Sequence, residues 1–252
     1  MSDTEEDKTP SLKTLFSPQI EELLNNVGIK QLTDLQYKAL KMIDKEHRMD
    51  VILTGNGNYG KTTSWMLGLT KFLNYSPPDG KLKAIVLVKN YRQGELLRDA
   101  LDYLLQGTNH KIESRPNISS ENSIKENIFQ KSIWIVYPES ILFFRDKLWN
   151  NKAFKFMHSL YYLIFDDIFI DDEKNEFLLS LSMKEYAKMM YEKNVFFKSI
   201  VTCKKIDEEV IFIKNEILRK HFYKEINMEP LDVFQVNFDD KLAFFDGVFC
   251  RK

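Results

Sequence analysis

The chain has 252 residues, of which 44% are hydrophobic, 13% aromatic and 29% charged, and its formal net charge is −1. This length fits one large domain with short extensions, and the composition is typical of a globular protein with a substantial core. The near-zero charge excludes a global field that would draw the chain to nucleic acid or to a membrane surface. No run of residues reaches the roughly 18 apolar positions of a membrane helix, so we expect no membrane partner.

The two cysteines and the start of the sequence bear on the compartment. Cys203 and Cys250 lie far apart without metal-ligand spacing, and no apolar leader opens the sequence. We therefore expect a reducing intracellular compartment, cytoplasmic or nuclear. Residues 1–10 are polar and acidic, and we expect them to form a disordered tail.

The first predicted elements are two helices. Ser17-Pro18 supplies an N-cap followed by proline at the first helical position, which predicts a helix over residues 18–27 that stops at Gly28. A second helix is predicted over residues 34–44.

From residue 50 onward, strand and helix patterns alternate. The strands are continuously apolar rather than alternating, which is typical of a mostly parallel sheet with helices on both faces. The sequence therefore predicts an α/β fold. Strands are expected at 50–55, 82–89, 132–138, 160–170 and 195–203, and helices at 61–73, 94–105, 139–148, 174–193 and 207–220.

The stretch TGNGNYGKTT, residues 54–63, matches the phosphate-loop pattern G-x-x-x-x-G-K-[ST]. Because it follows a predicted strand and opens a predicted helix, its backbone N–H groups are expected to cradle phosphate oxygens. Lys61 would reach the β- and γ-phosphates, and Thr62 would hold Mg²⁺. The predicted nucleotide-binding residues of this stretch are Gly55, Gly57, Asn58, Gly60, Lys61, Thr62 and Thr63.

Two acids end the most apolar predicted strand, YLIFDD. Asp166 is the predicted partner of Thr62 in holding Mg²⁺ through water. The alternative is that Asp166 and Asp167 are solvated acids at a strand end.

The order of these motifs resembles the first RecA-like domain of DEAD-box RNA helicases. GIKQLTDLQ, residues 28–36, looks like the Q motif of that family, with Gly28, Thr33 and Gln36 at matching positions. The resemblance implies a RecA-like three-layer sandwich that binds ATP and Mg²⁺. It also implies that Gln36, supported by Thr33, contacts the adenine and that Phe16 is a candidate to stack on the base.

Later segments extend the resemblance over most of the chain. AIVLVKNYRQGELL, IWIVYPES, IFDDIF and VTC occupy the places of the family segments A-P-T-R-E-L, T-P-G-R, D-E-A-D and S-A-T. The resemblance implies one RecA-like domain over residues 11–228. Residues 229–252 would be a linker and the beginning of a second RecA-like domain that is otherwise missing.

The departures from the family pattern fall on RNA contacts and on catalysis. Glu139 and Ser140 replace Gly-Arg, which places a negative group where an RNA phosphate would lie. Asp167 stands where the family has the glutamate that activates water. It is shorter by roughly 1.5 Å, which makes it a doubtful general base and predicts slow hydrolysis.

The family's polar link between D-E-A-D and S-A-T is also altered. Phe169 replaces the last acid, and Val201 and Cys203 replace its serine and threonine partners. We therefore expect this coupling to be lost.

Two functional hypotheses remain open. The first is a degenerate helicase-like domain that binds ATP, hydrolyses it weakly or not at all, does not unwind alone, and serves as a platform for a protein or RNP component, with weak RNA contact and no DNA. The second is the N-terminal half of an active ATP-dependent RNA helicase. Phe143, Phe144 and Trp149 are candidate partner contacts, with core packing as the alternative.

Overall fold

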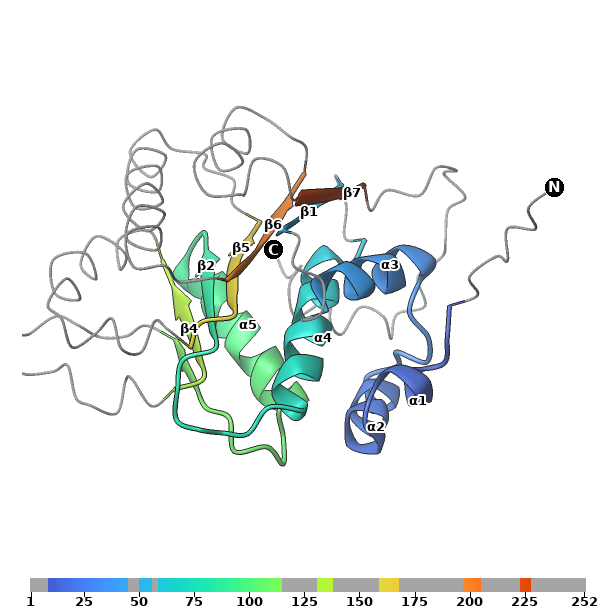
Figure 1. The fold of residues 1–252 in the computed structure, drawn as a ribbon, viewed down its shortest axis with the longest axis horizontal. Helices are drawn as coiled ribbons and strands as arrows, with labels where there is room; N and C mark the ends of the chain where they lie inside the picture. The colour runs from blue at the N-terminus through green and yellow to red at the C-terminus, as the bar shows by residue number, and fades with distance from the viewer. Residues whose placement is uncertain are drawn as a thin grey trace, which may run out of the picture.

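The computed structural model describes residues 9–44, 50–55, 59–114, 131–137, 159–167 and 197–204, together with the backbone of 223–227 (Figure 1). Several predictions lie outside the described residues. They concern the acidic tail as far as residue 8, the helices expected over 139–148, 174–193 and 207–220, the candidate contacts Phe143, Phe144 and Trp149, and the linker over 229–252.

Helices and strands alternate along the described part of the chain. The helices are α1 (Leu12–Leu15), α2 (Pro18–Asn26), α3 (Asp34–Ile43), α4 (Lys61–Asn74) and α5 (Tyr91–Leu104). The strands are β1 (Asp50–Thr54), β2 (Ala84–Val88), β3 (Ile112–Ser114), β4 (Ile133–Val136), β5 (Tyr162–Asp166), β6 (Lys198–Cys203) and β7 (Tyr223–Asn227).

The seven strands form one sheet in the order β3-β4-β2-β5-β6-β1-β7, and every strand pair in it is parallel. The prediction of a mostly parallel α/β sheet is therefore confirmed. β5 and β6 lie between β1 and β2, with Val88 opposite Asp166 and Leu53 opposite Thr202. Because all strands run the same way, the carboxyl ends of β1, β2, β5 and β6 meet at one edge of the sheet, where α/β proteins bind their ligands.

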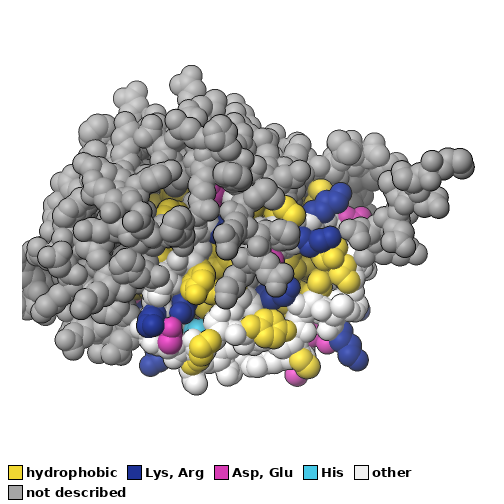
Figure 2. Space-filling model, viewed as in Figure 1, with side chains coloured by type: hydrophobic (Ala, Val, Ile, Leu, Met, Phe, Trp, Pro, Cys, Tyr) yellow, Lys and Arg dark blue, Asp and Glu magenta, His cyan; other side chains and the backbone are white. Residues whose placement is uncertain are grey.

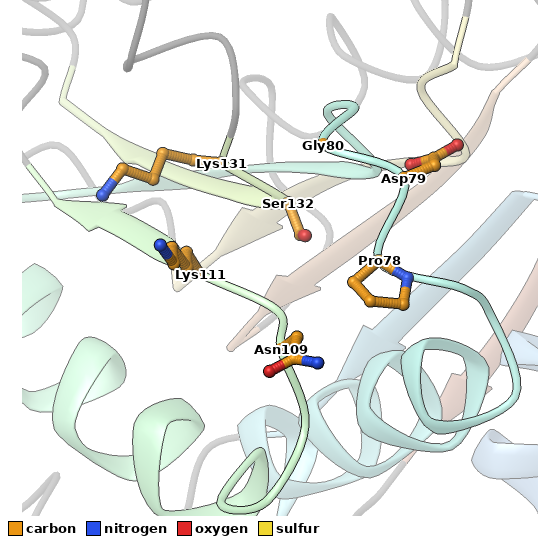
Figure 3. A pocket seen from close by; sticks show the side chains of 7 residues that line it. All are labelled: Pro78, Asp79, Gly80, Asn109, Lys111, Lys131 and Ser132. Carbon is orange, nitrogen blue, oxygen red and sulfur yellow. The ribbon is translucent and has the colours of Figure 1, made fainter.

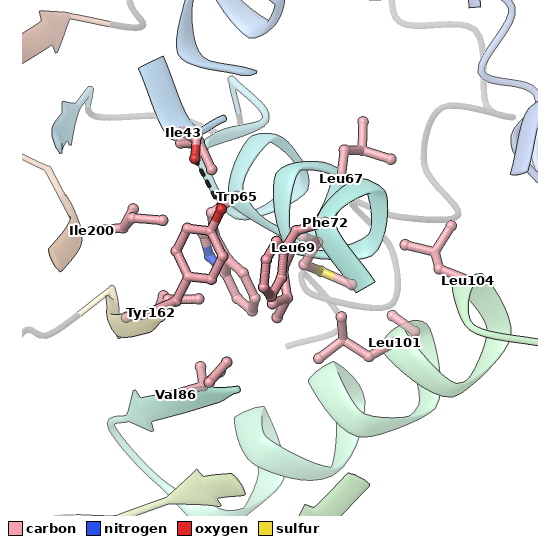
Figure 4. Close-up of a cluster of buried hydrophobic side chains, with 14 of the residues drawn as sticks. Ile43, Trp65, Leu67, Leu69, Phe72, Val86, Leu101, Leu104, Tyr162 and Ile200 are labelled. Carbon is pink, nitrogen blue, oxygen red and sulfur yellow. Dashed lines mark hydrogen bonds between the residues drawn. The ribbon is translucent and has the colours of Figure 1, made fainter. Parts of the chain in front are cut away.

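The main core lies between the sheet and the helices that follow β1 and β2. Figure 4 shows Trp65 and Phe72 of α4 among side chains from the sheet and from α5. The hydroxyl of Tyr162 donates a hydrogen bond to Ile43 O at 3.2 Å, which ties β5 to the end of α3 (Figure 4). Residues on the other face of the sheet, such as Ile85 and Phe165, are also buried, so the strands are covered on both faces.

Helix capping confirms the first two predicted helices. Ser17 accepts a hydrogen bond from Ile20 N, Pro18 occupies the first helical position, and Gly28 follows α2 with φ of 88°. Helix α3 begins with a capping box in which Thr33 and Gln36 bond reciprocally.

Helix α5 begins at Tyr91, three residues before the predicted start. The side chain of Asn90 accepts a hydrogen bond from Gln93 N and so caps the helix. Gly94 lies inside the helix, where a Cβ would come within 2.8 Å of Tyr137 Oη. Gly94 therefore allows close packing against Tyr137, the residue that follows β4.

The sequence patterns did not predict α1, β3 or β7. The first two have four and three residues, too few for a periodic signal, and the residues of β3 are only half-buried. β7 (YKEIN) carries two charged residues, and its place in the sheet comes from its pairing with β1. Within the described segments, no helix combines the length and apolar character needed to cross a membrane.

Candidate nucleotide-phosphate site

The phosphate-loop motif joins the carboxyl end of β1 to the start of α4, as predicted. Gly55 N–H donates to the carbonyls of Cys203 (3.1 Å) and Lys204 (3.0 Å), which anchors the loop to the end of β6. Gly55 and Gly60 have φ of 150° and 77°, values that favour glycine. Gly57 and Asn58 lie outside the described residues.

Lys61 and the first turn of α4 present positive groups to the loop. The Lys61 side chain is buried, and its Nζ donates to Gly55 O at 2.6 Å, so the ammonium group lies across the loop. Helix α4 has 14 residues and no side-chain cap at its N-terminus. The N-terminal turn of an α-helix is a favourable place for a bound phosphate. Thr63 follows in the first turn of α4 and is buried.

The predicted adenine residue lies beside the loop. A Cβ added at Gly60 would overlap Gln36 Nε2, so the amide group of Gln36 packs directly against this glycine. Gln36 Oε1 accepts from Thr33 N at 3.0 Å, and Gln36 N donates to Thr33 Oγ1 at 3.1 Å. Residues of the Q-motif resemblance and of the phosphate loop are thus neighbours in space.

Phe16 does not have the role suggested for it. Its side chain is only 4% exposed and belongs to the hydrophobic core. The suggestion that it stacks on a base is wrong, because a side chain enclosed in the core has no free ring face.

Thr62 and Asp166 meet across the carboxyl edge of the sheet. Thr62 Oγ1 donates to Asp166 Oδ1 at 3.0 Å and lies 3.3 Å from Oδ2. Mg²⁺ in nucleotide sites needs few protein oxygens because phosphates and water complete its shell. The hydroxyl and carboxylate pair fits that requirement, and no cluster of three or more acidic, histidine or cysteine side chains suited to a metal occurs in the described ranges.

Three further donors converge on the Asp166 carboxylate. Trp65 Nε1 lies 2.7 Å from Oδ1, and Thr202 Oγ1 lies 3.0 Å from the same oxygen. Gln93 Nε2 donates to Oδ2 at 3.1 Å and lies 3.2 Å from the Asp166 carbonyl oxygen. Asp166 is 1% exposed, and its carboxylate joins β5 to α4, α5 and β6.

Burial dominates the electrostatics of this carboxylate. It raises the pKa of Asp166, and the charge of Asp167 acts in the same direction. The hydrogen bonds from Trp65, Thr62 and Thr202 favour the ionised form and oppose this rise. The four donors therefore compensate in part for placing a carboxylate inside the protein.

A polar link through Thr202 joins the ends of β5 and β6, whereas the coupling expected to be lost involves Phe169, which lies outside the described residues. Val201 and Cys203 are apolar or nearly so, as the sequence indicated, but the residue between them donates to Asp166 and accepts from Asp167 N at 2.7 Å. Asp167 has φ of 49°, in the left-handed region, and this hydrogen bond helps to hold it there. Thr202 thus forms hydrogen bonds between the end of β6 and the end of β5.

Sequence reasoning did not identify Trp65, Gln93 or Thr202 as members of the site. One signal was available for Trp65, which lies three residues after Thr62 and therefore on the same helix face. A buried indole N–H also requires an acceptor. Gln93 and Thr202 carried no comparable signal.

Comparisons with known proteins identify the fold. No protein-family model and no curated protein sequence matches the chain. Solved structures do match it. A DEAD box protein from Methanococcus jannaschii has a TM-score of 0.68 and 16% identity over 87% of this chain and 56% of its own. The DEAD-box helicase Mss116, bound to ssRNA and UDP-BeF, has a TM-score of 0.67 and 15% identity over 87% of this chain and 44% of its own.

A third structure, the DUF1998 helicase MrfA bound to DNA, has a TM-score of 0.67 and 15% identity over 87% of this chain and 30% of its own. The chain thus spans between about a third and somewhat more than half of these helicases. At such low identity the likeness concerns the fold. The resemblance to the RecA-like domain of DEAD-box helicases is confirmed at that level, and this chain has the RecA-like α/β fold that those helicase structures contain.

Proposed function

We propose that this chain is a degenerate helicase-like domain that binds ATP with Mg²⁺, hydrolyses it weakly or not at all, and does not unwind nucleic acid alone. The observation that carries the proposal is the joint placement of Lys61, Thr62 and Asp166 at the junction of β1, α4 and β5. Mg²⁺ would neutralise phosphate charge there. Lys61 would bind phosphate oxygens, and Thr62 and Asp166 would hold the ion and its water.

The proposed weakness in catalysis rests on Asp167. Its backbone is held in the left-handed region by Thr202, and its side chain is one methylene shorter than the glutamate of the family that the sequence resembles. A reacting group displaced by about 1 Å loses roughly a hundredfold in rate.

The proposed partner is a protein or RNP component. The structures to which the chain is similar include one bound to ssRNA and AMP-PNP and one bound to DNA. We propose that this chain makes at most weak contacts with RNA, because Glu139 and Ser140 replace the Gly-Arg of the phosphate-gripping segment.

Nucleotide binding is tested by titration with a fluorescent ATP analogue in the presence of Mg²⁺. We expect saturable binding to the wild type and a loss of at least about tenfold in affinity in Lys61→Ala, since a charge-assisted phosphate contact is removed. Lys13→Ala is the matched control because this lysine lies exposed on α1. Binding that is equal in all three proteins, or absent up to millimolar nucleotide, contradicts the proposal.

The alternative is the N-terminal half of an active ATP-dependent RNA helicase, and retention of Gln36 beside the loop favours it. ATP turnover measured with and without single-stranded RNA and single-stranded DNA separates the two functions. Nucleic-acid stimulation above about tenfold supports the alternative, because it requires an intact link between the two sites. A low rate that neither strand changes supports the degenerate domain.

A further inference from the structure

A polar cavity of about 760 Å³ lies at the edge of the sheet opposite the phosphate loop. It is formed by segments that directly precede β2, β3 and β4, whereas the loop follows β1. Parallel strands of about five residues separate the two edges by roughly 15 Å. The cavity has the size of small-ligand pockets. Its lining residues are Pro78, Asp79, Gly80, Asn109, Lys111, Lys131 and Ser132 (Figure 3).

The cavity has an excess of positive charge. In Figure 3, the side chains of Lys111 and Lys131 lie on the same side of the cavity, to the left of Ser132. Lys131 Nζ lies 3.4 Å from Glu113 Oε2. On the face drawn in Figure 2, basic side chains and an acidic one lie together at the lower left.

The acid in the lining is already ion-paired. Asp79 Oδ2 lies 2.9 Å from Lys83 Nζ and 3.8 Å from Lys81 Nζ. Burial raises the pKa of Asp79, but hydrogen bonds from Lys83 and the Lys81 backbone, with the charges of both lysines, outweigh it and lower this pKa. Two lysines and one acid thus line the cavity, and because the acid is paired with lysines outside the lining, the balance favours an anion.

His110 fixes the orientation of the Ser132 hydroxyl. His110 Nε2 lies 2.9 Å from Leu73 O and 3.0 Å from Ser76 O. Since both neighbours are acceptors, we assign a ring proton to Nε2. In the tautomer that carries only this proton, the hydroxyl of Ser132, 2.8 Å from Nδ1, donates to the ring. Ser132 is 4% exposed, and its remaining lone pairs are available to accept from a ligand hydroxyl.

We infer that this cavity binds a small phosphorylated polar molecule, with Lys111 and Lys131 on the phosphoryl oxygens and Ser132 and Asn109 on ligand hydroxyl groups. Pro78 is the one apolar side chain among the described lining residues, which disfavours a hydrophobic ligand. A nucleic-acid strand is disfavoured because it requires a continuous basic track, whereas here two lysines line a cavity of limited volume. The site is independent of the nucleotide-phosphate site.

Calorimetric titration with ribose 5-phosphate tests the inference. The titrated protein is the full chain with the substitution Lys61→Ala, so that the phosphate loop does not contribute to the binding of ribose 5-phosphate. We expect saturable binding of ribose 5-phosphate and none of ribose, because the phosphoryl group supplies the charge. Lys111→Gln/Lys131→Gln should weaken binding at least about tenfold, since two charge-assisted contacts are lost. Lys13→Gln/Lys38→Gln, which removes two exposed lysines of α1 and α3, should leave it unchanged.

Acetylation of lysines, read by mass spectrometry, locates the ligand. Ribose 5-phosphate should protect Lys111 and Lys131 but not Lys13. Absence of saturation up to about 10 mM, or an equal loss in both double variants, overturns the inference. Protection of Lys111 and Lys131 by a decamer of uridylate but not by ribose 5-phosphate also overturns it, since the surface would then bind a strand. Each result is independent of whether the wild type binds ATP.

Discussion

The indole Nε1 of Trp65 lies 2.7 Å from Oδ1 of Asp166, and neither side chain is more than 1% exposed. A tryptophan of the phosphate-loop helix thus donates a charge-assisted hydrogen bond to the carboxylate expected to serve Mg²⁺. The same carboxylate also receives donors from α5 and β6. Asp166 therefore links four elements of the fold, in addition to any role toward a nucleotide.

Trp65→Phe tests this link. The substitution keeps an aromatic ring and removes the donor, and a buried carboxylate that loses a hydrogen bond costs about 1–3 kcal/mol. We expect the free energy of unfolding in urea to fall by that amount, and a double-mutant cycle with Asp166→Ala should give a coupling energy of similar size. A coupling energy near zero would show that the bond to Asp166 contributes nothing beyond packing.

A pair of threonine substitutions tests the contribution of the β6 end. Thr202→Val removes a hydroxyl that donates to Asp166 and accepts from Asp167 N, and we expect a loss of about 1–3 kcal/mol in unfolding free energy. Thr70→Val makes the same chemical change on α4, where the buried hydroxyl has no hydrogen-bond partner among the described residues. That change should be neutral within about 0.5 kcal/mol or stabilising. Chemical denaturation of both variants gives the comparison, and the reverse order would contradict it.

Alanine substitutions at Gly80 and Gly60 distinguish the cost of backbone strain from the cost of side-chain overlap. Gly80→Ala introduces a Cβ at φ of 67° with no atom within 4 Å, so we expect only the backbone cost of about 1–2 kcal/mol. Gly60→Ala has φ of 77° and also meets Gln36, so its loss should be larger. Gln36→Ala/Gly60→Ala should recover part of the difference, because the overlap is removed. The measurement is a double-mutant cycle of unfolding free energies, and strict additivity would contradict the packing of Gln36 on the loop.

Lys198 gives the protein a pH dependence in the alkaline range. Burial lowers its pKa to about 8, although the charges of Asp50 and Asp44 act in the opposite direction. Its Nζ donates to the carbonyls of Met42 and Asp44. Between pH 8 and the ordinary lysine pKa of about 10.5, Lys198 is protonated in the unfolded chain but neutral in the folded protein. The free energy of unfolding therefore rises with pH over this range.

The test compares the wild type with Lys198→Met between pH 7 and pH 10. The free energy of unfolding of the wild type minus that of the variant should increase by roughly 2–3 kcal/mol over this range. The subtraction removes the other titrating groups, which both proteins share. A difference that stays constant or falls with pH would show that Lys198 is not held with a lowered pKa.

Local sequence signals predicted much of the fold and part of the candidate site. Continuous apolar runs predicted five of the strands, and Ser17-Pro18 predicted the start of α2, because caps act within one helical turn. The pattern from Gly55 to Thr62 predicted the strand–loop–helix unit. Its role toward a nucleotide remains a prediction.

The tertiary structure alone decided which distant side chains meet. Trp65, Gln93 and Thr202 lie 36 to 101 residues from Asp166 along the chain and reach it only because α4, α5 and β6 converge at one sheet edge. The cavity at the opposite edge is likewise assembled from three separate turns. Periodicity and capping act over a few residues and therefore determine where helices and strands form. Which distant side chains come into contact depends on the order and register of the parallel strands, and these result from the packing of the whole sheet.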